Sequence, residues 1–145
     1  MDAAIDDTDS AYAPSSLVIG PFRRAVTETY FDLDLAIDKV AGGTPVVMCL
    51  LTSPEFYDPD VSVITTWTGP IAGHAVVAIG LAIYDGPPIP GGPEPGARFL
   101  CLRNSWGADW GRAGHVLMSE VVARQCTQVA LDIAPLDPDA RSIRA

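Results

Sequence analysis

The sequence predicts an α+β fold that is mostly β, with one or two short helices beside an antiparallel sheet. The chain has 145 residues, the usual size of a single domain. Apolar residues make up 48% of it and charged residues 19%, which leaves enough apolar surface to drive burial. Thirteen glycines and 13 prolines interrupt the chain often, and this favours short strands and loops over a helical bundle.

The charge excludes some classes of partner. Nine Lys and Arg against 18 Asp and Glu give a net charge of −9, so neither nucleic acid nor an anionic membrane surface is an expected partner. Residues 61–84 carry no charge, but Gly69-Pro70 and Gly73 would interrupt a membrane helix there. The acidic start has no apolar segment of signal-peptide type, so a cytoplasmic location is expected if Met1 is the native start.

The pattern along the chain divides it into three parts. Residues 1–16 are acidic and small and are expected to form a flexible lead-in, residues 17–134 the domain, and residues 135–145 a frayed tail. Three cysteines, an odd number without Cys-x-x-Cys spacing, indicate neither a disulfide framework nor a zinc site, and no cofactor is expected.

The first half of the domain predicts one helix and two strands. Asp34 is expected to cap a helix through Ala41, because Leu33, Ile37 and Val40 share one face and two glycines follow. Residues 45–51 are an apolar run of strand length that predicts burial on both faces, whereas residues 54–68 are rich in turn formers. Residues 74–84 predict the strongest strand, with a bulky face (Ala75, Val77, Ile79, Leu81, Ile83) opposite a small one that another backbone could approach.

The second half predicts three more strands around a long turn. Residues 85–96 contain five prolines and four glycines, so they must form a loop. If the hairpin is centred near residue 89, the residue numbers of two facing residues add up to about 178, and His74 lies opposite Asn104. Further strands are expected over residues 98–103, 114–119 and 128–133, with a turn of helix over residues 120–124.

Two motifs go beyond a generic β-rich domain. One is Gly73-His74-Ala75 at the head of an apolar strand, and the other is Asn104-Ser105-Trp106-Gly107 after the next strand. Together with the earlier Gly43-Thr44-Pro45-Val46 strand, they resemble the C-terminal half of papain-like cysteine peptidases over roughly residues 17–133. The resemblance implies the antiparallel, barrel-like right half-domain of that fold, and peptide or protein substrates.

The chemistry of that family explains why these residue types are needed. A thiol is weakly ionised near neutral pH, so an adjacent imidazole takes its proton and the thiolate attacks the peptide carbonyl. By resemblance, His74 is this general base and Asn104 orients it, with Trp106 and Ser105 supporting the active site. The indole shields the bond between imidazole and amide from water.

Each of these residues also has a simpler interpretation. A single His on an apolar strand is more often a satisfied core residue, and an Asn after a strand is often a turn residue; only their combination reverses that preference. Trp110 is expected to be structural, and His115 is expected to occupy a packing position. Cys49, Gly73 and Ala75 are expected, by resemblance, to lie in the substrate-binding region.

The nucleophile is missing from the matching region. In papain-like enzymes the catalytic Cys precedes the His by roughly 130 to 150 residues. Only 73 residues precede His74, and they contain no Cys-Gly-Ser-Cys-Trp-like segment. Cys49 could replace it only from an apolar strand, where a cysteine usually behaves as a small hydrophobic residue.

Three interpretations remain open from the sequence. In the first, the chain is one part of a split or processed cysteine peptidase, with the Cys half on a partner chain. Alternatively, it is a catalytically inactive relative that acts in protein binding, or a fragment of a longer enzyme with the Cys upstream. The missing half predicts a contiguous exposed apolar patch near His74 and Trp106, and hence association with a Cys-bearing chain or self-association.

Overall fold

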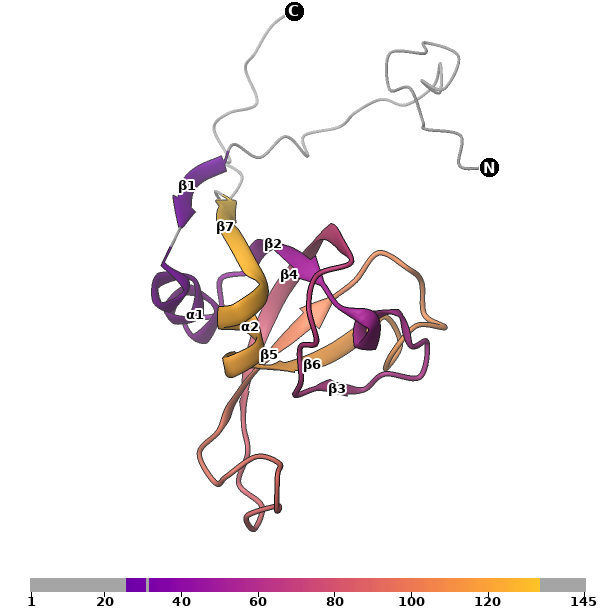
Figure 1. Ribbon diagram of the computed structural model, residues 1–145. Helices are drawn as coiled ribbons and strands as arrows, with labels where there is room; N and C mark the ends of the chain where they lie inside the picture. Colours follow the sequence, from indigo (N-terminus) through magenta and orange to yellow (C-terminus); the bar gives the residue numbers. More distant parts are fainter. Residues whose placement is uncertain (1–25, 31, 134–145) are drawn as a thin grey trace, which may run out of the picture. The chain divides into compact units, whose positions relative to one another are not determined.

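The computed structural model describes residues 26–30 and 32–133, and this part of the chain forms a seven-stranded sheet with two α-helices (Figure 1). The strand order is β1-β7-β2-β4-β5-β6-β3, and the neighbours are antiparallel except for the parallel pair β3 and β6. The predicted α+β, mostly β class is therefore confirmed. None of the described helices is long and apolar enough to cross a membrane.

The elements follow the sequence pattern closely in most places. The predicted lead-in over residues 1–16 and tail over residues 135–145 lie outside the described residues. In chain order the elements are β1 (Val26–Tyr30), α1 (Leu33–Ala41), β2 (Val46–Thr52), the 3-10 turn η2 (Pro54–Tyr57), β3 (Val63–Ile64), β4 (Ala72–Ile83), β5 (Arg98–Arg103), β6 (His115–Ser119), α2 (Glu120–Cys126) and β7 (Thr127–Ile133).

The helix α1 begins two residues earlier than the sequence predicted. Asp32, not Asp34, is the N-cap: its carboxylate accepts a hydrogen bond from the Asp34 N–H at 2.9 Å. Asp34 instead lies in the first turn, where its negative charge interacts favourably with the positive end of the helix dipole. Ile37 and Val40 are buried as predicted, and the helix ends at Ala41 with Gly42 as its C-cap.

The core lies on one face of the central strands. On β2 the side chains of Val46, Met48 and Leu50 are at most 2% exposed, while the alternate positions are only half-buried. The prediction that this strand is buried on both faces was therefore wrong, because its second face is only partly covered. Both helices contribute buried residues to the same cluster (Ala36, Ile37 and Val40 from α1; Val122, Ala123 and Cys126 from α2).

The strand β4 uses its smaller face for the core. Val76 and Ala78 are buried, whereas Ile79 and Ile83, on the predicted bulky face, are 42% and 64% exposed. The helix α1 contacts β4, and the fully buried Ala36 and Ala78 allow close packing in this region. Size alone therefore did not indicate which face of this strand points inward.

The β4–β5 hairpin has a different register from the predicted one. Val77 pairs with Arg103, two residues beyond its predicted partner Cys101, and the register shifts again between Ala78 and Gly80. The predicted loop over residues 85–96 is present, and it extends away from the sheet (Figure 1). A loop of this length does not determine the register of the strands that it joins.

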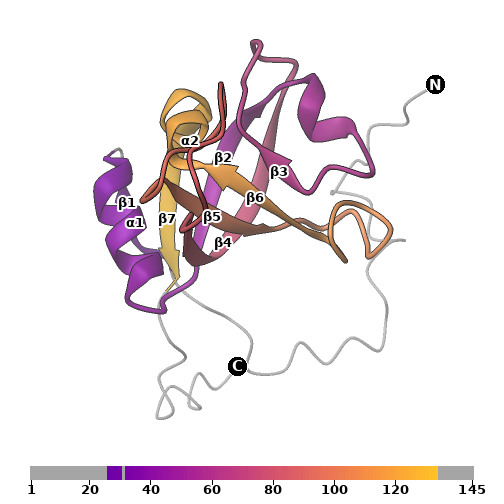
Figure 2. The ribbon, with the colours of Figure 1, turned by 90° about the horizontal axis from the view of Figure 1, so that it is seen from below.

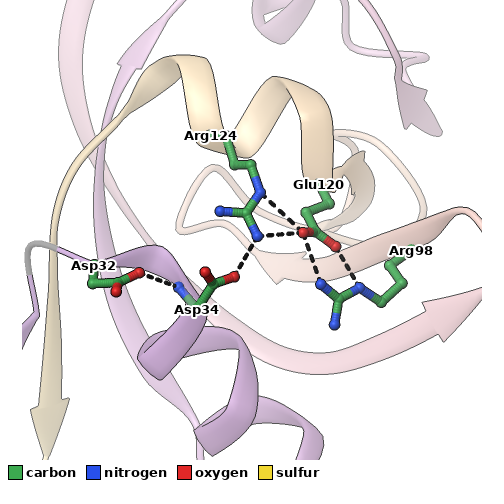
Figure 3. Close-up of polar contacts among 5 residues, drawn as sticks. All are labelled: Asp32, Asp34, Arg98, Glu120 and Arg124. Carbon is green, nitrogen blue, oxygen red and sulfur yellow. Dashed lines mark hydrogen bonds and ion pairs between the residues drawn. The ribbon is translucent and has the colours of Figure 1, made fainter.

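An ion-pair cluster joins the two helices to β5. Glu120, at the start of α2, accepts hydrogen bonds from Arg98 Nη2 at 2.8 Å and from Arg124 Nε at 3.0 Å (Figure 3). Arg124 also pairs with Asp34 of α1. These contacts hold α1 and α2 near each other (Figure 2). Arg98 is the first residue of β5, whereas Asn104 follows its last residue, so the cluster lies at the opposite end of this strand from Asn104.

Candidate active site

His74 projects from the core face of β4 near the start of that strand. It pairs with Leu50 of β2, and directly opposed residues of an antiparallel pair share a face. Leu50 is 2% exposed, so the half-buried imidazole lies at the border between the core and solvent. The β4–β5 ladder ends at the pair Val77 and Arg103, and His74 lies three residues before that end.

Asn104 follows β5 directly and is 4% exposed. Its backbone N–H donates to the Gly114 carbonyl at 2.9 Å, which closes the loop between β5 and β6. Its side-chain oxygen lies 2.8 Å from His74 Nε2, so the two predicted catalytic residues meet through their side chains. The backbone register predicted from the sequence was wrong, but the juxtaposition of the two side chains is present.

The hydrogen bonds around Asn104 determine the roles of the imidazole nitrogens. The Ser105 backbone N–H lies 2.8 Å from Asn104 Oδ1, and because an N–H can only donate, that side-chain atom must be the oxygen. The same oxygen can then only accept from His74, so His74 Nε2 carries a proton. His74 Nδ1 is left as the nitrogen that can take up or release a proton.

A cluster of aromatic rings surrounds the imidazole. The Trp106 indole lies 4.8 Å from the His74 ring, centroid to centroid, with the planes inclined by 37°. Phe56 of η2 approaches both rings edge-on, at 5.8 Å from His74 and 5.6 Å from Trp106. The Tyr57 ring lies 5.3 Å from the Trp106 ring, centroid to centroid. The rings restrict the access of water to the His74–Asn104 bond.

Trp110 anchors the loop that carries Trp106. It is 5% exposed, its indole N–H donates to the Phe56 carbonyl at 3.0 Å, and its ring lies 5.1 Å from the Phe56 ring. Next to it, the Gly111 N–H donates to the Pro59 carbonyl at 2.7 Å. Trp110 thus has the structural environment that the sequence predicted.

His115, the second histidine of the chain, has the opposite arrangement of ring nitrogens. Its Nδ1 lies 2.9 Å from the Ala113 carbonyl oxygen, which can only accept, so Nδ1 carries the proton. Its Nε2 faces Arg103 Nη1 at 3.3 Å and accepts from it. Both nitrogens of the half-buried His115 are therefore occupied by hydrogen bonds in an exposed environment.

The predicted substrate-binding residues lie together on the face of the sheet opposite His74. Cys49 pairs with Ala75, and Leu51 pairs with Gly73, so these side-chain positions share one face of the β2–β4 pair. Cys49 is half-buried there. Because it projects away from the His74 side, its thiol is badly placed to give a proton to the imidazole.

The other two cysteines are unsuited to attack a substrate. Burial raises the pKa of the Cys101 thiol, and burial raises the pKa of Cys126 to about 11. Cys126 lies in α2 with its sulfur 3.8 Å from the Met118 sulfur in the core. No group of three or more His, Cys, Asp and Glu side chains able to hold a metal ion occurs in the described part of the chain.

Sequence reasoning missed three residues that lie around the site. Thr52, Phe56 and Tyr57 come from the end of β2 and from η2, a segment that the sequence indicated only as turn-rich. The adjacent aromatic pair after Ser53-Pro54 was the available signal, because large apolar rings in a turn need a packing partner.

Comparison with known proteins agrees with this geometry. Residues 23–135 match the family model described as papain family cysteine protease. Over 98 residues the chain is 30% identical to ananain of Ananas comosus, and over 94 residues it is 30% identical to cathepsin K of Gallus gallus. These alignments cover 68% and 65% of this chain but only 26% and 25% of the relatives, so the chain spans about a quarter of their length.

Solved structures show the same fold. The digestive procathepsin L 3 of the Tenebrio molitor larval midgut superposes with a TM-score of 0.57 at 20% identity, over 77% of this chain and 36% of that one. The bromelain protease of Ananas comosus, solved in complex with the E64 inhibitor, gives 0.51 at 21% identity, over 75% and 50%. On the evidence of the family match and the arrangement around His74, the chain belongs to the papain family of cysteine proteases.

Proposed function

We propose that this chain is the C-terminal portion of a papain-like cysteine peptidase and supplies its general base and orienting amide. The nucleophilic thiol would come from a separate chain or from an upstream segment. One observation carries the proposal: Asn104 Oδ1 accepts from both Ser105 N–H and His74 Nε2, each at 2.8 Å. Because Oδ1 accepts from both groups, the proton lies on Nε2, and Nδ1 is the nitrogen that would exchange a proton with the thiol.

The proposed reaction uses His74 first as a base and then as an acid. His74 Nδ1 takes the proton of the thiol, and the thiolate attacks the peptide carbonyl carbon. When the peptide C–N bond breaks, Nδ1–H gives this proton to the leaving amine, which leaves a thioester. A water molecule, deprotonated by Nδ1, hydrolyses the thioester and regenerates the thiol. Asn104 keeps the imidazole plane in place throughout.

The surface around His74 supports the association of a second, Cys-bearing part. Trp106 is 39% exposed and lies against the His74 ring, and Tyr57, which lies against Trp106, is 45% exposed. Ile71, the residue before β4, is 59% exposed. In addition, the buried Asn104 Nδ2 has no hydrogen-bond partner among the described residues. A docking segment that covers the exposed Ile71, Tyr57 and Trp106 would remove apolar surface from water and bring the thiol to His74 Nδ1.

The two histidines of the chain provide a matched test in the thiol-bearing protein. Turnover of a fluorogenic peptide should fall by about 10²- to 10⁴-fold in His74→Ala, because a general base is lost. It should persist in His115→Ala and in Cys49→Ala. Turnover that survives His74→Ala would contradict the proposal. Turnover abolished by Cys49→Ala as well as by His74→Ala would assign the nucleophile to Cys49.

A further inference from the structure

Thr52 holds the segment that leads into His74. It is the last residue of β2, it is 2% exposed, and it pairs with Ala72, the first residue of β4. Its carbonyl accepts from the Ile71 N–H at 2.7 Å, and its hydroxyl lies 2.9 Å from the Ala72 carbonyl oxygen. The backbone two residues before His74 is therefore held by the side chain of Thr52 as well as by the sheet.

The direction of these hydrogen bonds is determined by their partners. A carbonyl oxygen can only accept, so the single hydroxyl hydrogen of Thr52 points to Ala72. The Tyr57 hydroxyl, 3.1 Å from Thr52 Oγ1, must then be the donor of the remaining bond. The result is a polarised chain from Tyr57 to Thr52 to Ala72, in which each bond strengthens the next.

The aromatic ring of Tyr57 closes the arrangement on its other side. It lies 5.3 Å from the Trp106 ring, and Trp106 lies 4.8 Å from the His74 ring. Tyr57 thus reaches His74 by two routes: through Thr52 and the β4 backbone, and through the Trp106 indole. Its 45% exposure shows that the side chain is not simply part of the core.

We propose that Thr52 and Tyr57 are positioning residues that hold the His74 imidazole and the Trp106 indole in the orientation that keeps His74 Nε2 on Asn104. Neither residue touches the reacting atoms. The inference rests on the proposed function, since it assumes that the orientation of His74 matters for catalysis. It extends that function by adding residues in a part of the chain where the family motifs do not lie.

The exchange of the His74 Nε2 proton measures this orientation directly. In ¹⁵N-labelled 145-residue protein, an Nε2–H bonded to Asn104 should exchange slowly with water, and His115, protonated on Nδ1, serves as the internal reference. We expect at least threefold faster exchange at His74 in Tyr57→Phe and in Thr52→Val. Thr52→Ser, which keeps the hydroxyl, should restore the slow exchange. Val122→Ala, a core truncation in α2, should leave it unchanged.

The outcomes distinguish the two proposals. If Tyr57→Phe and Thr52→Val leave the exchange unchanged while Asn104→Ala accelerates it, the positioning role is overturned and the proposed function stands. If Asn104→Ala also has no effect, the His74–Asn104 pairing itself is absent and both fail. Tyr57→Phe removes only a hydroxyl at a half-exposed side chain, so it keeps the test decisive even where Thr52→Val does not fold. In the thiol-bearing protein, Tyr57→Phe and Thr52→Val should lower kcat more than they change KM.

Discussion

Trp106 covers one side of His74, with the ring centroids 4.8 Å apart and the planes inclined by 37°. The indole is 39% exposed, and it also contacts Phe56 and Tyr57. It therefore separates the bond between His74 and Asn104 from solvent at a position where the rest of the core does not reach.

We expect Trp106→Ala to raise the free-energy barrier of the reaction by more than it lowers the free energy of unfolding. Water gains access to the His74–Asn104 bond and weakens it, so kcat/KM of the thiol-bearing protein should fall by about tenfold or more, or ~1.4 kcal/mol in the barrier. Val121→Ala, a truncation at a 67% exposed side chain in α2, is the control and should change neither quantity appreciably. Equal activity in Trp106→Ala and the parent protein would show that the indole does not protect the site.

Asn104→Ala should destabilise the fold as well as the site. The change leaves two donors without their acceptor, Ser105 N–H and His74 Nε2–H, and the loss of a part-buried hydrogen bond costs about 0.5–1.5 kcal/mol. Asn104→Asp keeps an acceptor oxygen and should be destabilised less. Urea unfolding of the three proteins measures the difference, and an Asn104→Ala variant as stable as the parent would contradict the hydrogen-bond arrangement described above.

Two glycines of the β5–β6 loop provide a matched pair for a test of backbone geometry. Gly107 and Gly111 both have positive φ, at 92° and 59°. A Cβ at Gly107 would meet nothing within 4 Å, whereas a Cβ at Gly111 would lie 2.5 Å from the His115 carbonyl oxygen. Gly107→Ala should therefore lower the free energy of unfolding only by the cost of a positive φ for a residue with a Cβ, about 1–2 kcal/mol. Gly111→Ala should lower it distinctly more. Equal free energies of unfolding would contradict the close approach at Gly111.

The ion-pair cluster predicts a loss of stability at acid pH. Hydrogen bonds from Arg98, and then from Arg124, lower the pKa of Glu120 below its ordinary value. Because the folded pKa lies below the unfolded value of about 4.3, the stabilisation is complete above the unfolded pKa and is lost as pH falls through the folded one. Chemical unfolding between about pH 6 and pH 3 should show this loss in the parent protein.

Glu120→Gln should remove that part of the pH dependence. The variant should be less stable than the parent near neutral pH, and the gap should narrow as the parent loses its ion pairs in acid. Glu94→Gln, at an exposed position in the β4–β5 loop, is the control and should follow the parent profile. A constant gap between Glu120→Gln and the parent across the acid range would show that this carboxylate does not govern the transition.

The sequence predicted those features that depend on local pattern. The bounds of β5 were predicted at residues 98–103 because turn formers flank an apolar run, and α1 was predicted from the spacing of Ile37 and Val40. The N-cap was misplaced because Asp32 and Asp34 are both chemically able to cap a helix. The strand β1 was not predicted, since its pairing with β7 is made across the whole length of the chain.

The site was predicted by motif and not by geometry. His74 and Asn104 were identified correctly as a pair that meets, although the assumed register was off by two residues at Val77. The contributions of Thr52 and Tyr57 depend on where a hydroxyl hydrogen points and which ring a side chain lies against. Such features arise from tertiary contacts and leave no periodic signal in a sequence.

In the proposed function, His74 and Asn104 serve a thiol outside the described residues. Labelling of the protein from its own source with a peptidyl epoxide, followed by native mass spectrometry, tests it most directly. We expect a species heavier than the 15.3 kDa of this chain, with the label on a second chain or on an extended N-terminal segment. An unlabelled species of 15.3 kDa would contradict the account and would favour an inactive papain-like module that acts in protein binding.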